Sequence, residues 1–274
     1  MPELPEVETV KRALVPRLEG RRIQRVEVLR RDLRFPLPDD FETRLQGRRV
    51  EHMGRRAKYI LAFLDDGQVW ITHLGMTGAL LGEDAASNSP HVHIRFTLDD
   101  GSRLLFRDPR RFGYMTLAET ATLDRHPFFQ HLGPEPLDES FTGAVLAKLL
   151  KGKTAPIKTA IMDQRVVVGV GNIYACEALY TAGLSPRRKA GTVTGGRAER
   201  LVAAIKETLK AAIDAGGSSI RDYVSPSGAI GDFQLRVKVY GREGEPCSCC
   251  SCATGIQRIV QAGRSTFFCP KIQR

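Results

Sequence analysis

Residues 92–106 decide the fold class of this 274-residue chain, because they combine alternating hydrophobicity with a turn signal. The stretch is Val92-His93-Ile94-Arg95-Phe96-Thr97-Leu98-Asp99-Asp100-Gly101-Ser102-Arg103-Leu104-Leu105-Phe106. Apolar residues occupy every second position from Val92 to Leu98, and a second apolar run follows the turn residues. A period of two marks a half-buried strand, and Asp-Gly between two such runs marks a hairpin. We therefore predict two antiparallel strands joined by a tight turn.

The same pattern extends from about Gly20 to Leu117. Tyr59–Leu64 and Val69–Ile71 flank Asp65-Asp66-Gly67, which predicts a second hairpin. One helix should precede this β-rich region and begin near Pro5, because Val7, Val10 and Leu14 recur at helical spacing.

After a loop-like stretch, Asp124–Ser140, the hydrophobic period becomes helical. Phe141–Leu150 and Tyr174–Ala182 are candidate helices, and an apolar stripe from Leu201 to Ile213 ends at Gly216-Gly217, a typical helix C-cap. A β-rich half followed by a helical half predicts an α+β chain of two domains, as the length also indicates.

The composition excludes a membrane protein and global disorder. The chain is 42% hydrophobic and 26% charged, without an apolar run near the roughly 18 residues that span a bilayer. Lys and Arg number 41 against 31 Asp and Glu, a net charge of +10 that is typical of proteins with a polyanionic partner. Met1–Val10 carries three glutamates and no apolar signal core, so we expect a cytoplasmic location.

Five of the six cysteines lie within the last 28 residues. In a reducing compartment, such clustering indicates a metal site rather than disulfides.

The chain begins Met1-Pro2-Glu3-Leu4-Pro5-Glu6-Val7-Glu8-Thr9. Removal of Met1 would leave Pro2 with a free secondary amine, and the reference pKa of an α-amino group, roughly 7.7 to 8.0, leaves a fraction unprotonated near neutral pH. Such an amine can attack an electrophilic carbon and form an iminium ion, while Glu3 beside it can transfer protons. Taken alone, the stretch is more simply explained as the start of a helix.

This opening resembles that of the bacterial formamidopyrimidine-DNA glycosylases, the repair enzymes that remove 8-oxoguanine and ring-opened purines. The resemblance extends over essentially the whole chain, through motifs whose order and spacing match the family. These motifs are Arg55-Arg56-Ala57-Lys58-Tyr59, His73-Leu74-Gly75-Met76-Thr77-Gly78, Asp108-Pro109-Arg110-Arg111-Phe112-Gly113, Leu132-Gly133-Pro134-Glu135-Pro136-Leu137, Gly169-Val170-Gly171-Asn172-Ile173-Tyr174 and Val239-Tyr240-Gly241-Arg242-Glu243-Gly244-Glu245-Pro246-Cys247.

The resemblance implies four catalytic residues. Pro2 would attack C1′ of the damaged nucleotide to form the Schiff base, and Glu3 would protonate the opening deoxyribose. Lys58 would donate a proton in β-elimination and contact phosphate, although a lysine in this position would by itself be interpreted as a solvated residue at a strand end. Arg264 would act at the flipped lesion and in δ-elimination.

An enzyme of this family must flip the damaged nucleotide out of the duplex, at a cost on the order of a few kcal/mol. The resemblance implies that Met76, Arg110 and Phe112 fill the resulting void. Met76 and Phe112 would wedge between bases, and Arg110 would bond the orphaned cytosine. The alternatives are core packing for the two apolar residues and a solvated pair for Arg110-Arg111.

By the same resemblance, His91, Arg110, Lys153 and Asn172 would contact double-stranded DNA that contains damaged purines. Asn172 follows a glycine-rich turn, where backbone N–H groups at a helix start can hold a phosphate. Phosphate contacts should make binding strongly salt-dependent. We assign His93 a structural or accessory role, and we expect a monomer.

The implied architecture has three parts. Residues 1–130 would form an N-terminal antiparallel β-sandwich with flanking helices, residues 131–235 a helix-two-turn-helix domain, and residues 236–274 a C-terminal β-hairpin resembling a zinc finger. Ser218–Phe233 corresponds to the family's mobile segment that closes over the extruded base.

The zinc-finger pattern is incomplete in this chain. The family's final Cys-Pro-x-Cys is Cys269-Pro270-Lys271-Ile272 here, and isoleucine cannot bind zinc. The first pair is ambiguous as well, because Cys249 forms Cys-x2-Cys with Cys252, whereas Cys247 does so with Cys250.

We predict one zinc ion per chain, although three other arrangements stay open: Cys250 as the extra ligand, a weaker three-thiolate site, and a hairpin without metal that relies on packing. The predicted ligands are Cys247, Cys249, Cys252 and Cys269.

The sequence thus predicts a bifunctional glycosylase that excises 8-oxoguanine and formamidopyrimidines and then nicks the abasic (AP) site by β,δ-elimination. One alternative is a pyrimidine-directed glycosylase of the same superfamily, against which the opening Glu3-Leu4-Pro5-Glu6 argues, since that branch begins Glu-Gly-Pro. The other is a lesion-binding protein without catalysis, which the lost fourth cysteine makes conceivable.

Overall fold

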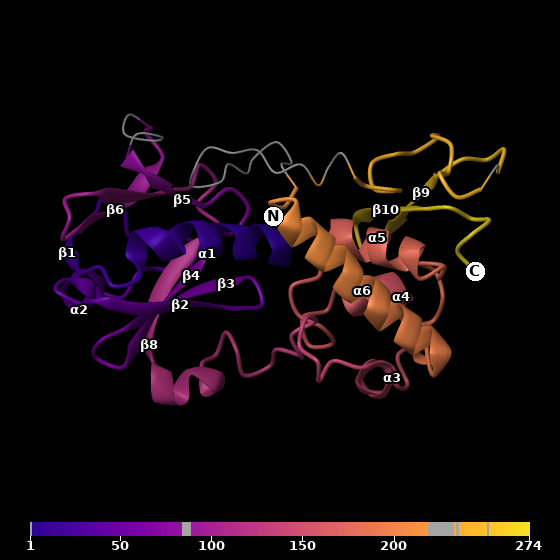
Figure 1. Ribbon diagram of the computed structural model, residues 1–274, viewed down its shortest axis with the longest axis horizontal. Helices are drawn as coiled ribbons and strands as arrows, with labels where there is room; N and C mark the ends of the chain where they lie inside the picture. Colours follow the sequence, from indigo (N-terminus) through magenta and orange to yellow (C-terminus); the bar gives the residue numbers. More distant parts are fainter. Residues whose placement is uncertain (1, 84–88, 219–232, 234–235, 251) are drawn as a thin grey trace. The chain divides into compact units, whose positions relative to one another are not determined.

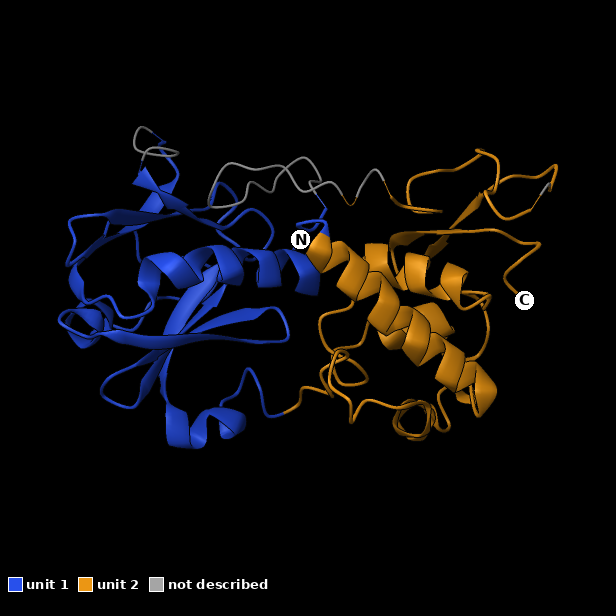
Figure 2. Ribbon diagram, in the orientation of Figure 1, with its two compact units in different colours: residues 1–130, 215–232 blue, residues 131–214, 233–274 orange. Residues whose placement is uncertain are grey.

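The computed structural model describes residues 2–83, 89–218, 233, 236–250 and 252–274. The chain divides into two compact units, shown in Figure 2: residues 1–130 with 215–232, and residues 131–214 with 233–274. Within the described part of the chain, none of the helices has the length and apolar character needed to cross a membrane.

The first unit is built from two four-stranded antiparallel sheets (Figure 1), with strand orders β1-β6-β7-β5 and β2-β3-β4-β8. This arrangement confirms the predicted β-sandwich. Its elements are α1 (Leu4–Leu18), β1 (Ile23–Val28), α2 (Phe41–Leu45), β2 (Val50–Arg56), β3 (Tyr59–Leu64), β4 (Gln68–His73), β5 (Ala79–Gly82), β6 (Val92–Leu98), β7 (Arg103–Arg107), β8 (Tyr114–Glu119) and the 3-10 helix η2 (Thr120–Arg125).

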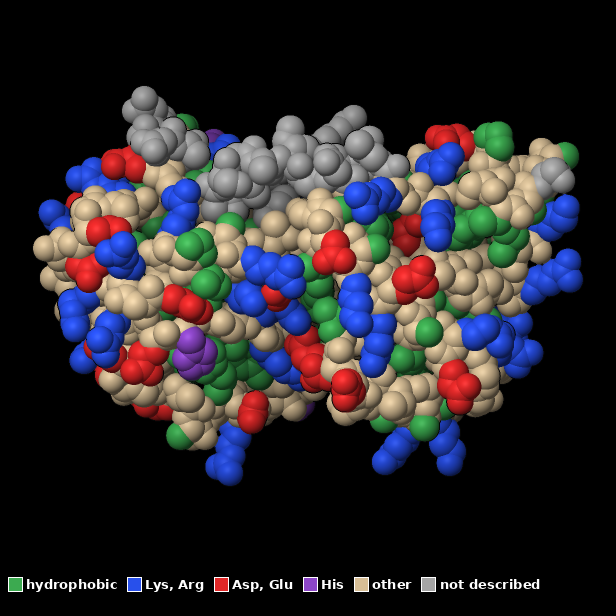
Figure 3. Space-filling model, in the orientation of Figure 1, with side chains coloured by type: hydrophobic (Ala, Val, Ile, Leu, Met, Phe, Trp, Pro, Cys, Tyr) green, Lys and Arg blue, Asp and Glu red, His purple; other side chains and the backbone are tan. Residues whose placement is uncertain are grey.

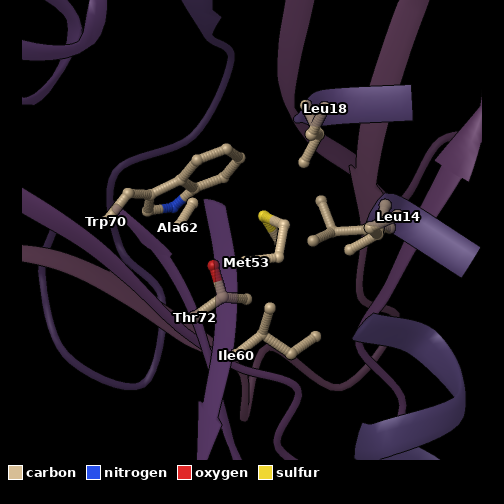
Figure 4. Close-up of a pocket in the computed structure, with 8 residues that line it drawn as sticks. Leu14, Leu18, Met53, Ile60, Ala62, Trp70 and Thr72 are labelled. Atoms are coloured by element: carbon tan, nitrogen blue, oxygen red, sulfur yellow. The ribbon is translucent and has the colours of Figure 1, made fainter. Parts of the chain in front are cut away.

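Both sheets and α1 bury their apolar side chains in one core. Helix α1 contributes the predicted stripe of Val7, Val10 and Leu14, and it packs against β2 and β3. Figure 4 shows side chains from α1 and the β2–β4 sheet converging on a gap of about 10 Å³. Because this volume is no larger than one water molecule needs and the lining is almost wholly apolar, the gap is a packing defect rather than a ligand site.

Strand β6 contains a bulge that the alternating sequence does not reveal. Its pairing with β7 shifts register between Val92 and Ile94. Ile94 therefore faces the main core with Phe96, whereas Val92 packs into a small separate cluster with Leu105. A bulge puts an extra residue into one strand and reverses the side-chain phase beyond it.

The second unit is helical and ends in a hairpin. Helix α6 packs against α3 and α5, and β10 packs against α5 (Figure 1). The elements are α3 (Gly143–Leu150), α4 (Ile157–Ile161), α5 (Asn172–Thr181), the 3-10 helix η3 (Ala190–Thr192), α6 (Gly196–Asp214), β9 (Gln257–Gln261) and β10 (Arg264–Phe268).

Helix boundaries differ from the sequence prediction by a few residues. The hydroxyl of Thr142 accepts the N–H of Val145 at 3.3 Å, so Thr142 is the N-cap and α3 begins at Gly143 rather than at Phe141. Helix α4 was not predicted, because five residues are too few to display a helical period.

The C-terminal hairpin is confirmed. Ala262 and Gly263 join β9 to β10 with φ angles of 48° and 72°, the left-handed backbone that a two-residue turn requires. Arg264 is the first residue after this turn and is exposed.

Candidate active site and metal centre

Pro2 and Glu3 lie buried at the start of α1, with Glu3 as the N-cap. The backbone N–H of Glu3 donates to Oε2 of Glu6 at 2.8 Å, and Pro5 occupies the first turn. The N-terminal stretch does start a helix, which is the simpler of the two interpretations of its sequence. The same geometry holds an acid directly beside the predicted nucleophile and shields both residues from water.

The Glu6 carboxylate joins this helix start to a distant part of the chain. Its Oε1 accepts the backbone N–H of Ser218 at 2.8 Å and the Ser218 hydroxyl at 3.0 Å. Ser218 begins the segment predicted to close over the extruded base, whose residues 219–232 lie outside the described residues. Glu6 is therefore a functional candidate that the sequence patterns did not single out.

Lys58 is not the solvated strand-end lysine of the simpler interpretation: its exposed fraction is only 6%. It follows Ala57, whose φ of 53° turns β2 into β3. Arg55 fixes this turn, because its Nη1 donates to the Ala57 carbonyl at 2.9 Å while its Nε donates to Glu8 of α1 at 3.1 Å. The Glu8–Arg55 contact thus links α1, which carries Pro2 and Glu3, to the turn that carries Lys58.

His73, at the end of β4, lies close enough to Lys58 for the two charges to interact. Burial, reinforced by the positive charge of Lys58, lowers the pKa of His73 to about 4. The rings of Tyr59 and Tyr114 enclose the imidazole, each with its centroid 4.9 Å away. His73 is therefore neutral at physiological pH, and its Nδ1 accepts the N–H of Gly75 at 3.0 Å.

The predicted void-filling residues come from two adjoining loops of the first unit. Met76 is half-buried and Phe112 is 39% exposed, so neither is a core residue. The Arg110 guanidinium lies over the Phe112 ring, 4.8 Å from its centroid. At Gly75, where φ is 63°, a Cβ would lie only 2.2 Å from the carbonyl carbon of Phe112. The two loops can approach this closely only because residue 75 has no side chain.

Buried Asp108 fastens these loops together. Its Oδ1 accepts the Thr77 hydroxyl at 2.5 Å, and its Oδ2 accepts the N–H of Gly113 at 2.7 Å. Thr77 Oγ1 in turn accepts the N–H of Arg110 at 3.1 Å. One carboxylate therefore sets the relative positions of the chain around Met76 and around Phe112.

The two histidines near β6 have different environments. His91 is exposed, and its carbonyl accepts the N–H of Asp108 at 3.0 Å, which places it beside the Arg110 loop. His93 is buried, and its Nε2 lies 2.8 Å from the Asp108 carbonyl oxygen. This contact is structural and supports the same loop.

In the second unit, Asn172 is the first residue of α5 and follows the N-cap Gly171. Its Oδ1 accepts the ammonium of Lys158, and its Nδ2 donates to the Ser265 carbonyl at 3.0 Å. The side chain that was predicted to contact DNA thus ties α5 to the hairpin and to a buried lysine of α4. Lys158, 1% exposed, escaped the sequence analysis because α4 is so short.

Two other predicted functional residues of this unit are Lys153 and Arg264. Lys153 is half-buried in the turn after α3, where its carbonyl accepts the N–H of Gly191 at 2.8 Å. Arg264 is exposed at the tip of the hairpin.

Glu177, buried in α5, is a third residue that the sequence patterns did not reveal. Its two carboxylate oxygens accept the backbone N–H groups of Lys238, Val239 and Tyr240 at 2.8 to 3.0 Å. These bonds anchor the chain that leads into the cysteine-rich segment. A single glutamate in an otherwise ordinary helix gives no sequence signal of such a role.

Three thiols form a compact group near the end of β10. The sulfur atoms of Cys247, Cys250 and Cys269 all lie within 4.8 Å of one another, and Cys252 Sγ is 3.7 Å from Cys269 Sγ. Cys249, which belongs to the predicted ligand set, is exposed and lies outside this group. Clustered, mostly buried thiols are the donor set that zinc prefers, so these residues fit a zinc ion.

The chain matches known proteins over its full length. The N-terminal domain of the formamidopyrimidine-DNA glycosylases matches residues 1–115, and their H2TH domain matches residues 132–224. The proteins named formamidopyrimidine-DNA glycosylase from Beijerinckia indica and Rhodospirillum rubrum are 54% and 53% identical to it, with all of both chains covered in each case.

The comparison with solved structures gives the same result as the comparison with sequences. The crystal structure of the MutM (Fpg) protein from Thermus thermophilus has a TM-score of 0.88 at 41% identity, covering 99% of this chain and 98% of that one. A complex between Lactococcus lactis Fpg and DNA containing an abasic site has a TM-score of 0.89 at 35% identity, covering 99% of each chain. With the family domains matched over most of its length and relatives this similar, the chain belongs to the formamidopyrimidine-DNA glycosylase family.

Proposed function

We propose that this chain excises oxidised purines, 8-oxoguanine and formamidopyrimidines, from double-stranded DNA and then cleaves the resulting abasic site. The observation that carries the proposal is the burial of Pro2 and Glu3 together at the start of α1. Family membership supports it, as do the Lactococcus lactis Fpg complexes with DNA that contains an abasic site or a Fapy-dG lesion.

The first step uses the imino group of Pro2, which removal of Met1 exposes. Its nitrogen attacks C1′ of the extruded nucleotide, and the bond from C1′ to the base breaks with the base as leaving group. Glu3 delivers a proton to the ring oxygen of the deoxyribose as the sugar opens to the iminium ion. Water exclusion around Pro2 and Glu3 protects this ion from premature hydrolysis.

The lyase steps follow on the same adduct. Loss of a C2′ proton expels the 3′ phosphate, and loss of a C4′ proton then expels the 5′ phosphate, which leaves a one-nucleotide gap. We assign the donor role in β-elimination to Lys58 and the role in δ-elimination to Arg264. Lys58 is buried beside neutral His73, which gives the lysine a fixed position from which to contact phosphate.

DNA binding is assigned to both units. We assign contacts with the DNA to His91 and Arg110 of the first unit and to Lys153 and Asn172 of the second. Met76, Arg110 and Phe112 fill the void that the flipped nucleotide leaves. On the face in Figure 3, basic and acidic side chains lie interspersed. The net charge of +10 therefore attracts DNA in a general way and does not mark a specific contact.

We further assign residues 1–130 to the catalytic domain, residues 131–235 to the helix-two-turn-helix domain and residues 236–274 to the finger. Zinc held by the clustered cysteines would supply cross-links that a hairpin of this size cannot replace with apolar packing. It has no part in the chemistry at Pro2.

Borohydride trapping tests the function. The purified chain is incubated with an 8-oxoguanine duplex and sodium borohydride, which reduces the iminium ion to a stable protein–DNA adduct. The wild type is expected to form this adduct, and Pro2→Gly is expected to bind the duplex without forming it. Mass spectrometry of the active wild type should show that Met1 has been removed.

The remaining outcomes identify the alternatives. Tight binding of the lesion by wild type without any adduct would establish a lesion-binding protein instead of an enzyme. Faster excision of thymine glycol than of 8-oxoguanine would establish a pyrimidine-directed glycosylase. Retention of Met1 in active protein would overturn the role of Pro2.

A further inference from the structure

The spacing of the thiols distinguishes between the possible ligand sets. Zinc with four sulfur ligands at about 2.3 Å requires neighbouring sulfur atoms to lie about 3.8 Å apart in a tetrahedron. Cys269 Sγ lies 3.5 Å from Cys250 Sγ and 3.7 Å from Cys252 Sγ. Cys247 is within 4.8 Å of both Cys250 and Cys269. Three sulfur atoms are thus mutually close, and Cys252 adjoins this trio through Cys269.

We propose that the zinc ion of this chain is bound by Cys247, Cys250, Cys252 and Cys269, with Cys249 outside the site. Three ligands then come from one short segment and the fourth from the residue after β10. This inference rests on the zinc site of the proposed function and specifies its ligands. It differs from the family pattern, in which the last ligand stands where this chain has Ile272.

The residues left out of the site have other surroundings. Cys249 is exposed, with its Sγ 3.9 Å from the Ser248 hydroxyl. Ile272 packs as a half-buried apolar side chain against the buried cluster that contains Cys247 and Cys269. Ile272 stabilises the turn after Cys269 by packing. A cysteine of the segment 247–252 takes the place of the ligand that the family has at position 272.

The turn after Cys269 is held independently of metal. The Cys269 N–H donates to Oε1 of buried Gln273 at 2.8 Å, and Gln273 Nε2 donates to the Leu184 carbonyl at 3.0 Å. Cys269 is therefore fixed against the helical core by hydrogen bonds that do not involve its sulfur.

The test compares matched serine variants of the full-length chain. Zinc per chain is measured by inductively coupled plasma mass spectrometry, and the number of sulfur ligands by X-ray absorption. We expect one zinc and four sulfurs in the wild type and in Cys249→Ser. Cys250→Ser and Cys252→Ser should each lose most of the zinc or retain it with only three sulfurs. In the Cys252→Ser background, Ile272→Cys should restore four-sulfur coordination.

Circular dichroism checks that each variant is folded, and Co²⁺ titration gives a second ligand count when zinc is lost. Loss of zinc in Cys249→Ser, together with unchanged four-sulfur zinc in Cys250→Ser, would overturn the proposed set. A folded wild type that binds neither Zn²⁺ nor Co²⁺ would overturn the zinc site altogether. Borohydride trapping is scored on the same samples, so failure of the glycosylase function is recognised separately.

Discussion

The helix start that carries Pro2 and the cysteine-rich segment before β9 differ in how their residues are held. Around Pro2, side chains sit on regular elements and are fixed by buried carboxylates, as Glu6 shows with its bonds to Glu3 and Ser218. Cys247 and Cys250 lie outside helices and strands. Residues on rigid elements have defined positions, whereas a metal ion can select ligands from several on a loop. This difference explains how one region keeps the family pattern while the other departs from it.

The largest expected effect concerns Glu3. Glu3→Gln keeps the size of the N-cap side chain but removes its proton, so excision of 8-oxoguanine should slow by about 10²- to 10⁴-fold, the usual contribution of general acid catalysis. Single-turnover kinetics on the lesion duplex measure this. Exposed Glu51→Gln is the control and should match wild type. A change of less than about tenfold in Glu3→Gln would contradict a proton-transfer role.

The second prediction concerns the carboxylate that joins the void-filling loops. Asp108→Ala removes two hydrogen bonds to a charged group, each worth about 1.5–3 kcal/mol, so the unfolding free energy of the first unit should fall by about 3 kcal/mol or more. Trp70, the only tryptophan of the chain, reports urea unfolding of this unit.

Asp99→Ala is the matched control, because the Asp99 side chain is 44% exposed and its contact with Arg21 is a surface ion pair at 4.0 Å. It should cost less than about 1 kcal/mol. Equal losses in the two variants would show that Asp108 does not fasten the loops.

The third prediction concerns pH. His73, with a pKa of about 4 in the folded chain, stays neutral while the unfolded chain takes up a proton below about pH 6.5. The contribution of His73 to the free energy of unfolding is therefore complete above the pKa of this residue in the unfolded chain. It falls as the pH decreases towards 4, by about 2 kcal/mol between pH 6.5 and 5. His73→Gln should flatten this part of the stability curve, measured by Trp70 fluorescence. Exposed His52→Gln should leave the slope unchanged, and an unchanged slope in His73→Gln would refute the prediction.

The smallest effect is expected at the hairpin. Gln273→Ala removes the acceptor of the Cys269 N–H, so protection of that amide against hydrogen exchange should fall by about 1–2 kcal/mol. The loss should be smaller with zinc bound, since the metal also holds Cys269. Gln257→Ala on β9 serves as the control. Equal protection with and without metal would mean that zinc does not restrain this turn.

Much of the fold followed from local pattern. Strand β3 was predicted with its observed bounds, Tyr59–Leu64, and the hairpins on either side of Asp65–Gly67 and Asp99–Ser102 form as predicted. The bulge in β6 was not predicted, because it leaves the spacing of apolar residues unchanged and appears only in the pairing with β7.

The candidate site residues were named from the sequence, but their surroundings were not predictable from it. The family motifs led to Pro2, Glu3 and Lys58, yet the burial of Lys58 accompanies a turn at Ala57 that Arg55 ties to Glu8 of α1. Glu6 and Glu177 were missed, since each acts on backbone N–H groups far away in sequence. Backbone groups are the same at every residue, so their partners leave no trace in the sequence.

The sequence by itself determined the helix and strand periods, the family, and the position of Pro2, the proposed nucleophile, next to an acid. These properties depend on residues within a few positions of one another. Only the tertiary structure decided that Cys250 rather than Cys249 meets Cys269, and that one carboxylate joins Thr77 to Gly113. Both depend on distances between atoms that the folded backbone brings together, and residue spacing along the chain does not specify such distances.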